Sequence, residues 1–100
     1  MTVGESTPSL SLQGKVALVT GGGTGIGKGI ALEFARAGAV VAISGRRIGP
    51  LEDVAKEITD FGQRALPVSA DVSKKTDVDN LVDTVDRDVG QNDILVKSAA

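Results

Sequence analysis

The sequence contains no cysteine, histidine, tryptophan or tyrosine, and its only aromatic residues are two phenylalanines. Without thiolates or imidazoles the chain cannot build a common zinc site, a Ser-His-Asp triad or a Cys-His pair. Acidic residues outnumber basic ones by 13 to 11, so the net charge of -2 provides no positive field for nucleic acid. No apolar run approaches the roughly 18 residues that cross a bilayer. We therefore expect no metal, no nucleic acid and no membrane as partners.

The remaining composition is that of one small globular domain. Hydrophobic residues make up 41% and charged residues 24% of the sequence, as is usual for a globular chain. Because 100 residues are about enough for one small domain, we expect no second domain within them. Residues 1–11 are rich in serine and threonine and lack the basic start and apolar core of a signal peptide. We expect a flexible leader at 1–11, one domain at 12–100, and a cytoplasmic location.

The most informative stretch is an apolar run, residues 15–20, that passes directly into five glycines within residues 21–27. A strand is predicted to stop there and a helix to start. Each glycine costs conformational entropy on ordering and supplies no side chain to bury, so packing does not explain this density. Amide N–H groups at a helix N-terminus hold an anion closely when no Cβ intervenes. The pattern predicts a phosphate held by main chain.

The rest of the chain alternates between stretches with the apolar spacing of a helix and short apolar runs typical of strands. Apolar spacing predicts helices from Ile26 to Gly38, from Pro50 to Gly62, and from an N-cap at Ser73 to Gly90. Short apolar runs predict strands at 39–44, 65–70 and 93–96, with Pro67 indicating an edge strand. Crossovers that carry helices are too long for hairpins, so we expect an α/β fold with a parallel sheet and right-handed connections.

Two alternative roles for the glycines stay open at this point. The first is a structural strand-to-helix turn with no ligand. The second is a nucleotide triphosphatase loop, since Gly22 and Gly27-Lys28 fit G-x-x-x-x-G-K, but Gly29 stands where a hydroxyl should bind Mg²⁺. The strict dinucleotide motif G-x-G-x-x-G is absent, because no three glycines of the loop have that spacing.

The pattern Thr20-Gly21-x-x-x-Gly25-Ile26-Gly27 resembles the short-chain dehydrogenase/reductase family. The resemblance runs from about residue 12 to the last residue, and Asp71-Val72 and the run 93–96 are also similar to the family. It implies a Rossmann-like, three-layer fold of four strands in the order 3-2-1-4 and three helices, truncated after the fourth strand. It also implies a cofactor-binding role for Gly21, Gly23, Thr24, Gly25, Ile26, Gly27, Asp71 and Val72, to which the chemistry of the second strand's end adds Arg46 and Arg47.

The end of the second strand predicts which dinucleotide is preferred. A site for NAD carries an acid there that binds the ribose 2′-hydroxyl. This chain has Gly45, followed by Arg46 and Arg47, whose guanidinium groups suit a 2′-phosphate. We expect NADP (NADPH) to be preferred over NAD. The alternative is that both arginines are merely solvated.

The sequence also departs from the family pattern at two places. The family's serine, tyrosine and lysine catalyse hydride transfer between the nicotinamide and a carbonyl or alcohol carbon, and they lie beyond its fourth strand. This chain has no tyrosine, so no catalytic residue is assigned and we expect the chain alone to be inactive. Lys97-Ser98 replaces the family's Asn-Asn.

The function expected is therefore the cofactor-binding half of an NAD(P)-dependent oxidoreductase. Three features are similar to reductases that act on acyl-carrier or coenzyme A thioesters: the glycine-rich loop, Lys28-Gly29 and the final Ala99-Ala100. A small-molecule substrate is expected only in a full-length form. The parent family forms homo-oligomers, and the exposed fourth strand predicts that this chain self-associates. The alternative is a non-catalytic dinucleotide-binding or interaction module.

Overall fold

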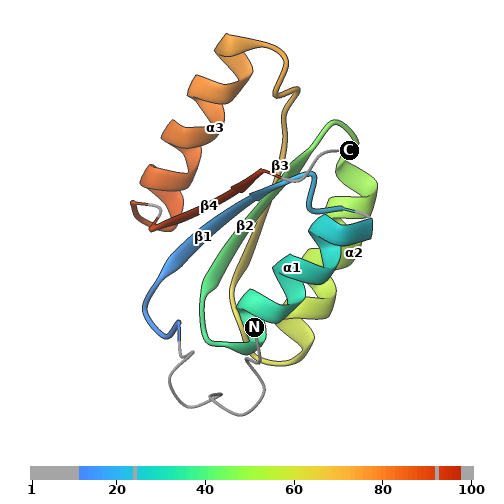
Figure 1. Ribbon diagram of the computed structural model, residues 1–100, viewed down its shortest axis with the longest axis vertical. Helices are drawn as coiled ribbons and strands as arrows, with labels where there is room; N and C mark the ends of the chain where they lie inside the picture. Colours follow the sequence, from blue (N-terminus) through green and yellow to red (C-terminus); the bar gives the residue numbers. More distant parts are fainter. Residues whose placement is uncertain (1–11, 24, 92, 98–100) are drawn as a thin grey trace.

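The computed structural model describes residues 12–23, 25–91 and 93–97. Within them a parallel sheet of four strands lies between three helices, in the strand order β3-β2-β1-β4 (Figure 1). The elements in chain order are β1 (Val16–Thr20), α1 (Gly25–Arg36), β2 (Val40–Gly45), α2 (Ile48–Asp60), β3 (Ala65–Ser69), α3 (Lys75–Asp88) and β4 (Ile94–Lys97). The Rossmann-like fold class, the parallel pairing and the strand order are confirmed.

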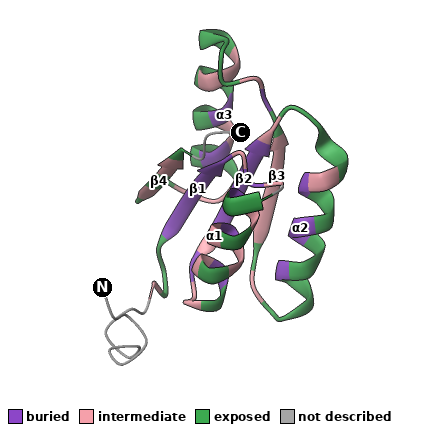
Figure 2. Cartoon of the chain, turned by 45° about the vertical axis from the view of Figure 1, so that its right-hand side comes forward, coloured by how far each residue is buried: buried purple, intermediate pink, exposed green. Residues whose placement is uncertain are grey.

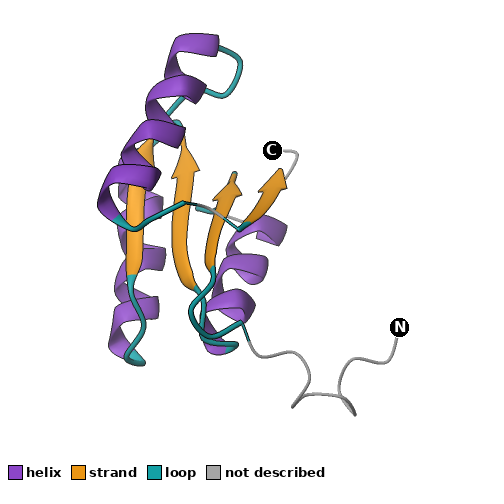
Figure 3. Cartoon of the chain, turned by 90° about the vertical axis from the view of Figure 1, so that its left-hand side faces the viewer, coloured by secondary structure: helices purple, strands orange, loops and turns teal. Residues whose placement is uncertain are grey.

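The helices make three layers with the sheet. Helices α1 and α2 lie on one face of the sheet and α3 lies on the other (Figure 1), and Figure 3 shows the sheet from one face, with its strands side by side. Their apolar faces create two cores, one on each side. The larger core joins Val19 and Ile43 to buried residues of α1 and α2, and the smaller joins Leu18 to Leu81 and Val85 of α3.

Burial follows from strand position. Every residue of β1 is buried, and so are the four middle residues of β2, because neighbours cover both strands on all sides (Figure 2). β3 and β4 are the sheet edges in the described part of the chain and are less buried. Pro67 lies in β3 and pairs with Ile43, which confirms its expected edge position. An edge strand tolerates the missing donor.

Helix ends are where the expectations were partly wrong. Gly38, Gly62 and Gly90 all have positive φ and follow helix C-termini as expected. α2 begins two residues before Pro50, which lies in its first turn. Ser73 is not the N-cap of α3: the helix starts at Lys75, with Lys74 as the cap residue, because Ser73 bonds backward to Asp71. The predicted leader, 1–11, lies outside the described residues.

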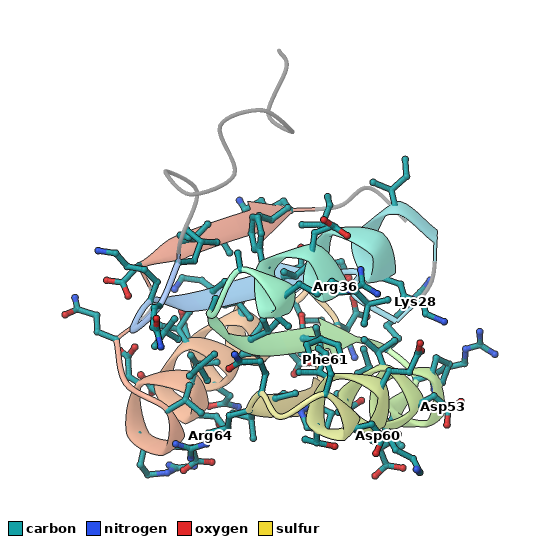
Figure 4. The ribbon with its side chains drawn as sticks, turned by 90° about the horizontal axis from the view of Figure 1, so that it is seen from below. Lys28, Arg36, Asp53, Asp60, Phe61 and Arg64 are labelled. Atoms are coloured by element: carbon teal, nitrogen blue, oxygen red, sulfur yellow. The ribbon has the colours of Figure 1, made fainter. Side chains whose placement is uncertain are left out.

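Two contacts fix α1 against α2. Lys28 Nζ lies 3.1 Å from a carboxylate oxygen of Glu57. At the other end of the helix pair, the guanidinium of Arg36 lies over the ring of Phe61, 5.7 Å from its centroid (Figure 4). The start of β1 is fixed separately, because Asp93 exchanges two bonds with Val16: its carboxylate accepts the Val16 N–H at 2.9 Å and its N–H donates to the Val16 carbonyl at 2.7 Å.

Candidate dinucleotide site

The glycine loop turns tightly between β1 and α1. Gly21 and Gly25 have positive φ, of 71° and 58°, which side chains rarely adopt. Gly27 needs its missing Cβ for another reason, since a Cβ there would overlap the carbonyl oxygen of Gly21. A Cβ on Gly22 would lie 2.7 Å from a methyl carbon of Ile43. Part of the glycine density therefore does come from packing, contrary to the expectation from sequence.

The first two amides of the loop are already used within the chain. Gly21 and Gly22 both donate to the main-chain carbonyl of Ser44, at 2.7 and 3.1 Å. These bonds tie the loop to the end of β2. Gly21 shapes the turn and does not offer its N–H to a ligand. Ser44 was missed by sequence reasoning, because nothing in its residue type indicates that its carbonyl holds the loop.

The start of α1 is the part that remains open to an anion. The first N–H groups of any helix have no carbonyl one turn earlier to bind. No acidic side chain occupies the first turn of α1, and a Cβ on Gly25 would meet nothing within 4 Å. Ile26 is 78% exposed beside it. Thr24 lies outside the described residues. An anion approaching Gly25 and Ile26 meets bare, partly positive main chain.

The arginine loop follows β2 at the same edge of the sheet. Its main chain is held by β3, since the Ala70 N–H donates to the Gly45 carbonyl at 2.8 Å and Ser69 Oγ donates to the Arg46 carbonyl at 3.1 Å. The Arg46 and Arg47 side chains are exposed, and neither makes a hydrogen bond or ion pair with a described residue. Ser69 is a second residue that the sequence alone did not indicate.

The Asp71 loop follows β3. The Asp71 carboxylate Oδ1 accepts from the Ser73 hydroxyl at 2.7 Å and the Ser73 amide at 3.0 Å. The Ser73 hydroxyl, and next the Ser73 amide, hold the pKa of Asp71 below its ordinary value. Partial burial opposes this lowering, whereas the charges of Arg46 and Lys74 add to it. Asp71 thus stays ionised beside Arg46, and Val72 next to it is 54% exposed.

These loops come together because the carboxyl ends of parallel strands meet at one edge. Hydrogen bonds link the loop after β1 to β2, and the loop after β2 to β3. The predicted site residues that the structure describes all lie on these three loops or on the first turn of α1. Among the described residues no group of acids could hold a metal ion, and no helix there is long and apolar enough to span a bilayer.

Comparison with known proteins identifies the family. The sequence model described as short chain dehydrogenase matches residues 15–100. The chain belongs to the short-chain dehydrogenase family of oxidoreductases.

The relatives of this family member are much longer proteins. Hydroxynaphthalene reductase-like protein Arp2 of Metarhizium robertsii is 45% identical over 100 residues, covering 99% of this chain and 37% of that protein. Probable 2,4-dienoyl-CoA reductase 3 of Caenorhabditis elegans is 49% identical over 92 residues, covering 90% of this chain and 30% of that protein. The chain therefore spans about a third of the length of these curated relatives.

A solved structure agrees with both the fold and the family. L-sorbose reductase from Gluconobacter frateurii, complexed with NADPH and L-sorbose, is 38% identical. It superposes with a TM-score of 0.86 over 91% of this chain and 35% of that chain.

Proposed function

We propose that this chain is the NADP-binding part of a short-chain oxidoreductase. The diphosphate lies against the start of α1, the adenosine 2′-phosphate against Arg46 and Arg47, and the adenine against Asp71 and Val72. Bound cofactor supplies or accepts a hydride at its nicotinamide ring. Residues 1–100 supply binding and orientation, and we propose that they do not turn over substrate alone, since they include no tyrosine to serve as the acid or base.

The observation that carries the proposal is the position of two exposed arginines directly after β2, at the carboxyl end of the sheet. Five other basic side chains pair with acids, those of Lys28, Arg36, Lys56, Lys75 and Arg87, whereas Lys15, Lys74 and Lys97 make no ion pair with a described residue, like the two arginines, but do not follow β2. Neither Arg46 nor Arg47 makes an ion pair with a described residue, although the charge of Arg46 acts on Asp71. The first turn of α2, which follows them, contains no acid. The N-terminus of α2 and the two guanidinium groups favour the same ligand, a doubly charged phosphate. A ribose 2′-hydroxyl would leave both cations unmatched.

The relatives support a carbonyl or thioester substrate in the whole protein. One relative is named as a dienoyl-CoA reductase and a structural neighbour was solved with NADPH and a sugar. We propose a small-molecule carbonyl or alcohol, with an acyl thioester as one candidate. The alternative of a non-catalytic binding module is not favoured, because the matched relatives are named as reductases. The cytoplasmic location stays a prediction.

The proposed function is tested by titrating the purified chain with NADPH while following the fluorescence of the cofactor. NADH is the matched control, because it differs only by the 2′-phosphate. We expect NADPH to bind at least about tenfold more tightly, the equivalent of one charge-assisted hydrogen bond. A folded chain that binds neither cofactor would refute the proposal, and equal affinities would refute the preference for NADP.

A further inference from the structure

β4 forms one edge of the sheet in the described part of the chain, next to β1 (Figure 3). The Val96 carbonyl accepts the hydroxyl of Thr20 in β1 at 3.3 Å, so this carbonyl is directed into the sheet. Main-chain groups of successive residues in a strand point to opposite edges, so those of Leu95 are directed outward. Outward main-chain groups on an edge strand can pair with a further strand.

The side chains along β4 divide between the two faces of the sheet. Ile94 and Val96 pack against the larger core, on the side of α1. Alternation places Asp93, Leu95 and Lys97 on the other face, and all three are exposed. This edge of the sheet therefore presents an acid, a leucine and a lysine, in that order along the chain.

Both charged residues can take a partner. Asp93 is held in line with the strand, because its carboxylate Oδ2 accepts the Val16 N–H at 2.9 Å and its own N–H donates to the Val16 carbonyl at 2.7 Å. No described residue donates to the other carboxylate oxygen of Asp93. Neither Asp93 nor Lys97 makes an ion pair with a described residue.

The order of the three exposed residues makes the edge complementary to itself. When a second copy of β4 pairs antiparallel with Leu95 opposite Leu95, each Lys97 faces Asp93 of the other copy. An apolar pair then lies between two pairs of opposite charge, and directly opposed residues of this kind stabilise antiparallel strands. The neighbouring registers that keep these side chains on one face place a charge opposite Leu95, so the charges select the centred register.

We propose that β4 is the contact strand of a symmetrical dimer, in which two copies of this chain pair antiparallel about Leu95 and Lys97 of each copy faces Asp93 of the other. Such a contact uses the same surface on both copies, as a two-fold axis requires. The two sheets then join into one continuous sheet. The dimer does not depend on a bound dinucleotide, because none of these three residues belongs to the proposed cofactor site.

A charge-exchange experiment tests the pairing and its register. Sedimentation equilibrium measures the dimer dissociation constant of the parent chain, of Lys97→Asp, of Asp93→Lys, and of an equal mixture of the two variants. Each variant alone brings two pairs of like charge together, so its dissociation constant should rise at least about tenfold. In the mixed dimer every acid again faces a lysine, so the mixture should return to within about threefold of the parent.

Two further variants keep the result interpretable. Lys74→Asp is the matched control, because it makes the same change in net charge at an exposed residue outside β4, and it should change the dissociation constant less than about threefold. Asp93→Asn replaces Asp93→Lys if the lysine variant does not fold, since an amide oxygen can still accept the Val16 N–H. A mixture of Asp93→Asn and Lys97→Asp should associate more tightly than either alone. Thermal unfolding establishes that each variant is folded.

Three results would overturn the proposal. A parent chain that stays monomeric would show that the β4 edge takes another partner, such as a further segment of a longer protein. Equal effects of Lys97→Asp and Lys74→Asp would show that only net charge matters. A mixture that associates no better than its separate components would place the contact in another register or on another surface.

Discussion

Gly27 lies directly against Gly21, so that a Cβ on Gly27 would overlap the Gly21 carbonyl oxygen. The first turn of α1 and the end of β1 are thereby in backbone contact across the loop. The contact orients the helix so that its N-terminal amides face the edge of the sheet where the ligand is proposed to bind. The close contact between Gly21 and Gly27 thus determines where the proposed diphosphate site lies.

Substituting Gly27 by alanine should therefore destabilise the fold by about 1–3 kcal/mol, the usual cost of forcing a methyl group into a packed site. Gly29 is the matched control, because it lies in the same helix and a Cβ there meets nothing within 4 Å. Gly29→Ala should be neutral or stabilise by up to about 1 kcal/mol through helix propensity. Urea unfolding of the two variants measures the difference. Equal stabilities would show that the close contact is not structurally important.

Arg46→Asp should weaken NADPH binding by about 10- to 100-fold, since a charge-assisted hydrogen bond of about 1.5–3 kcal/mol is replaced by repulsion. NADH binding should change by less than about threefold, because NADH lacks the 2′-phosphate. Lys15→Asp is the control, because it makes the same change in charge just before the amino end of β1. That end of the sheet lies away from the carboxyl ends of the strands, where the cofactor is proposed to bind. Equal losses for both cofactors in Arg46→Asp would contradict the assigned role.

Gly45→Asp tests the same specificity from the opposite direction. A carboxylate at the end of β2 can bind a ribose 2′-hydroxyl and repels a 2′-phosphate. The backbone allows it, because a Cβ at Gly45 lies 3.4 Å from Leu51, which is near ordinary contact, and its φ is not positive. The NADPH to NADH affinity ratio should fall at least about tenfold. Gly45→Asn, which is similar in shape but uncharged, should change it far less, and an equal effect would rule out a role for the charge.

The low pKa of Asp71 predicts how stability depends on pH. The Ser73 hydroxyl is the main cause, so Asp71 is more acidic when folded than when unfolded. Such a group adds stability above its unfolded pKa of about 3.9, and that stability is lost as pH falls through the lower, folded pKa. Ser73→Ala should therefore be less stable than the parent at neutral pH, and the difference should shrink below about pH 4. Urea unfolding across this range measures it, and a gap that widened in acid would contradict the assignment.

Sequence patterns were sufficient for the order and type of the elements. The apolar runs of β1 and β2 predict strands, that of β2 one covered on both faces, and Gly38, Gly62 and Gly90 mark helix ends because few other residues adopt positive φ. The Rossmann-like order needed the family resemblance, since periodicity does not determine which strands are neighbours. The predicted start of α3 was wrong, because Ser73 bonds to Asp71 instead of capping the helix.

The candidate site was only partly visible in the sequence. Glycines, arginines and Asp71 are recognisable by residue type and by their position after strands. Ser44 and Ser69 were not, because each acts on main chain far away in the sequence: Ser44 through its carbonyl on Gly21, Ser69 through its hydroxyl on Arg46. Such contacts depend on strand neighbours, so they could be found only once β2 was placed between β1 and β3.

Leu95 provides the last prediction, on self-association. It lies in β4, the edge of the described sheet, and its side chain is 52% exposed. An exposed apolar edge strand pairs readily with another chain, so we propose that the 100-residue chain self-associates through β4. Leu95→Lys should shift sedimentation toward the monomer, because a charge on an edge strand opposes pairing. Val82→Lys is the control, since Val82 is 36% exposed but lies on α3. A parent chain that remained monomeric over a wide range of concentrations would disprove the proposal. If Leu95→Lys and Val82→Lys had equal effects on sedimentation, added charge alone would explain them, and pairing through β4 would be contradicted.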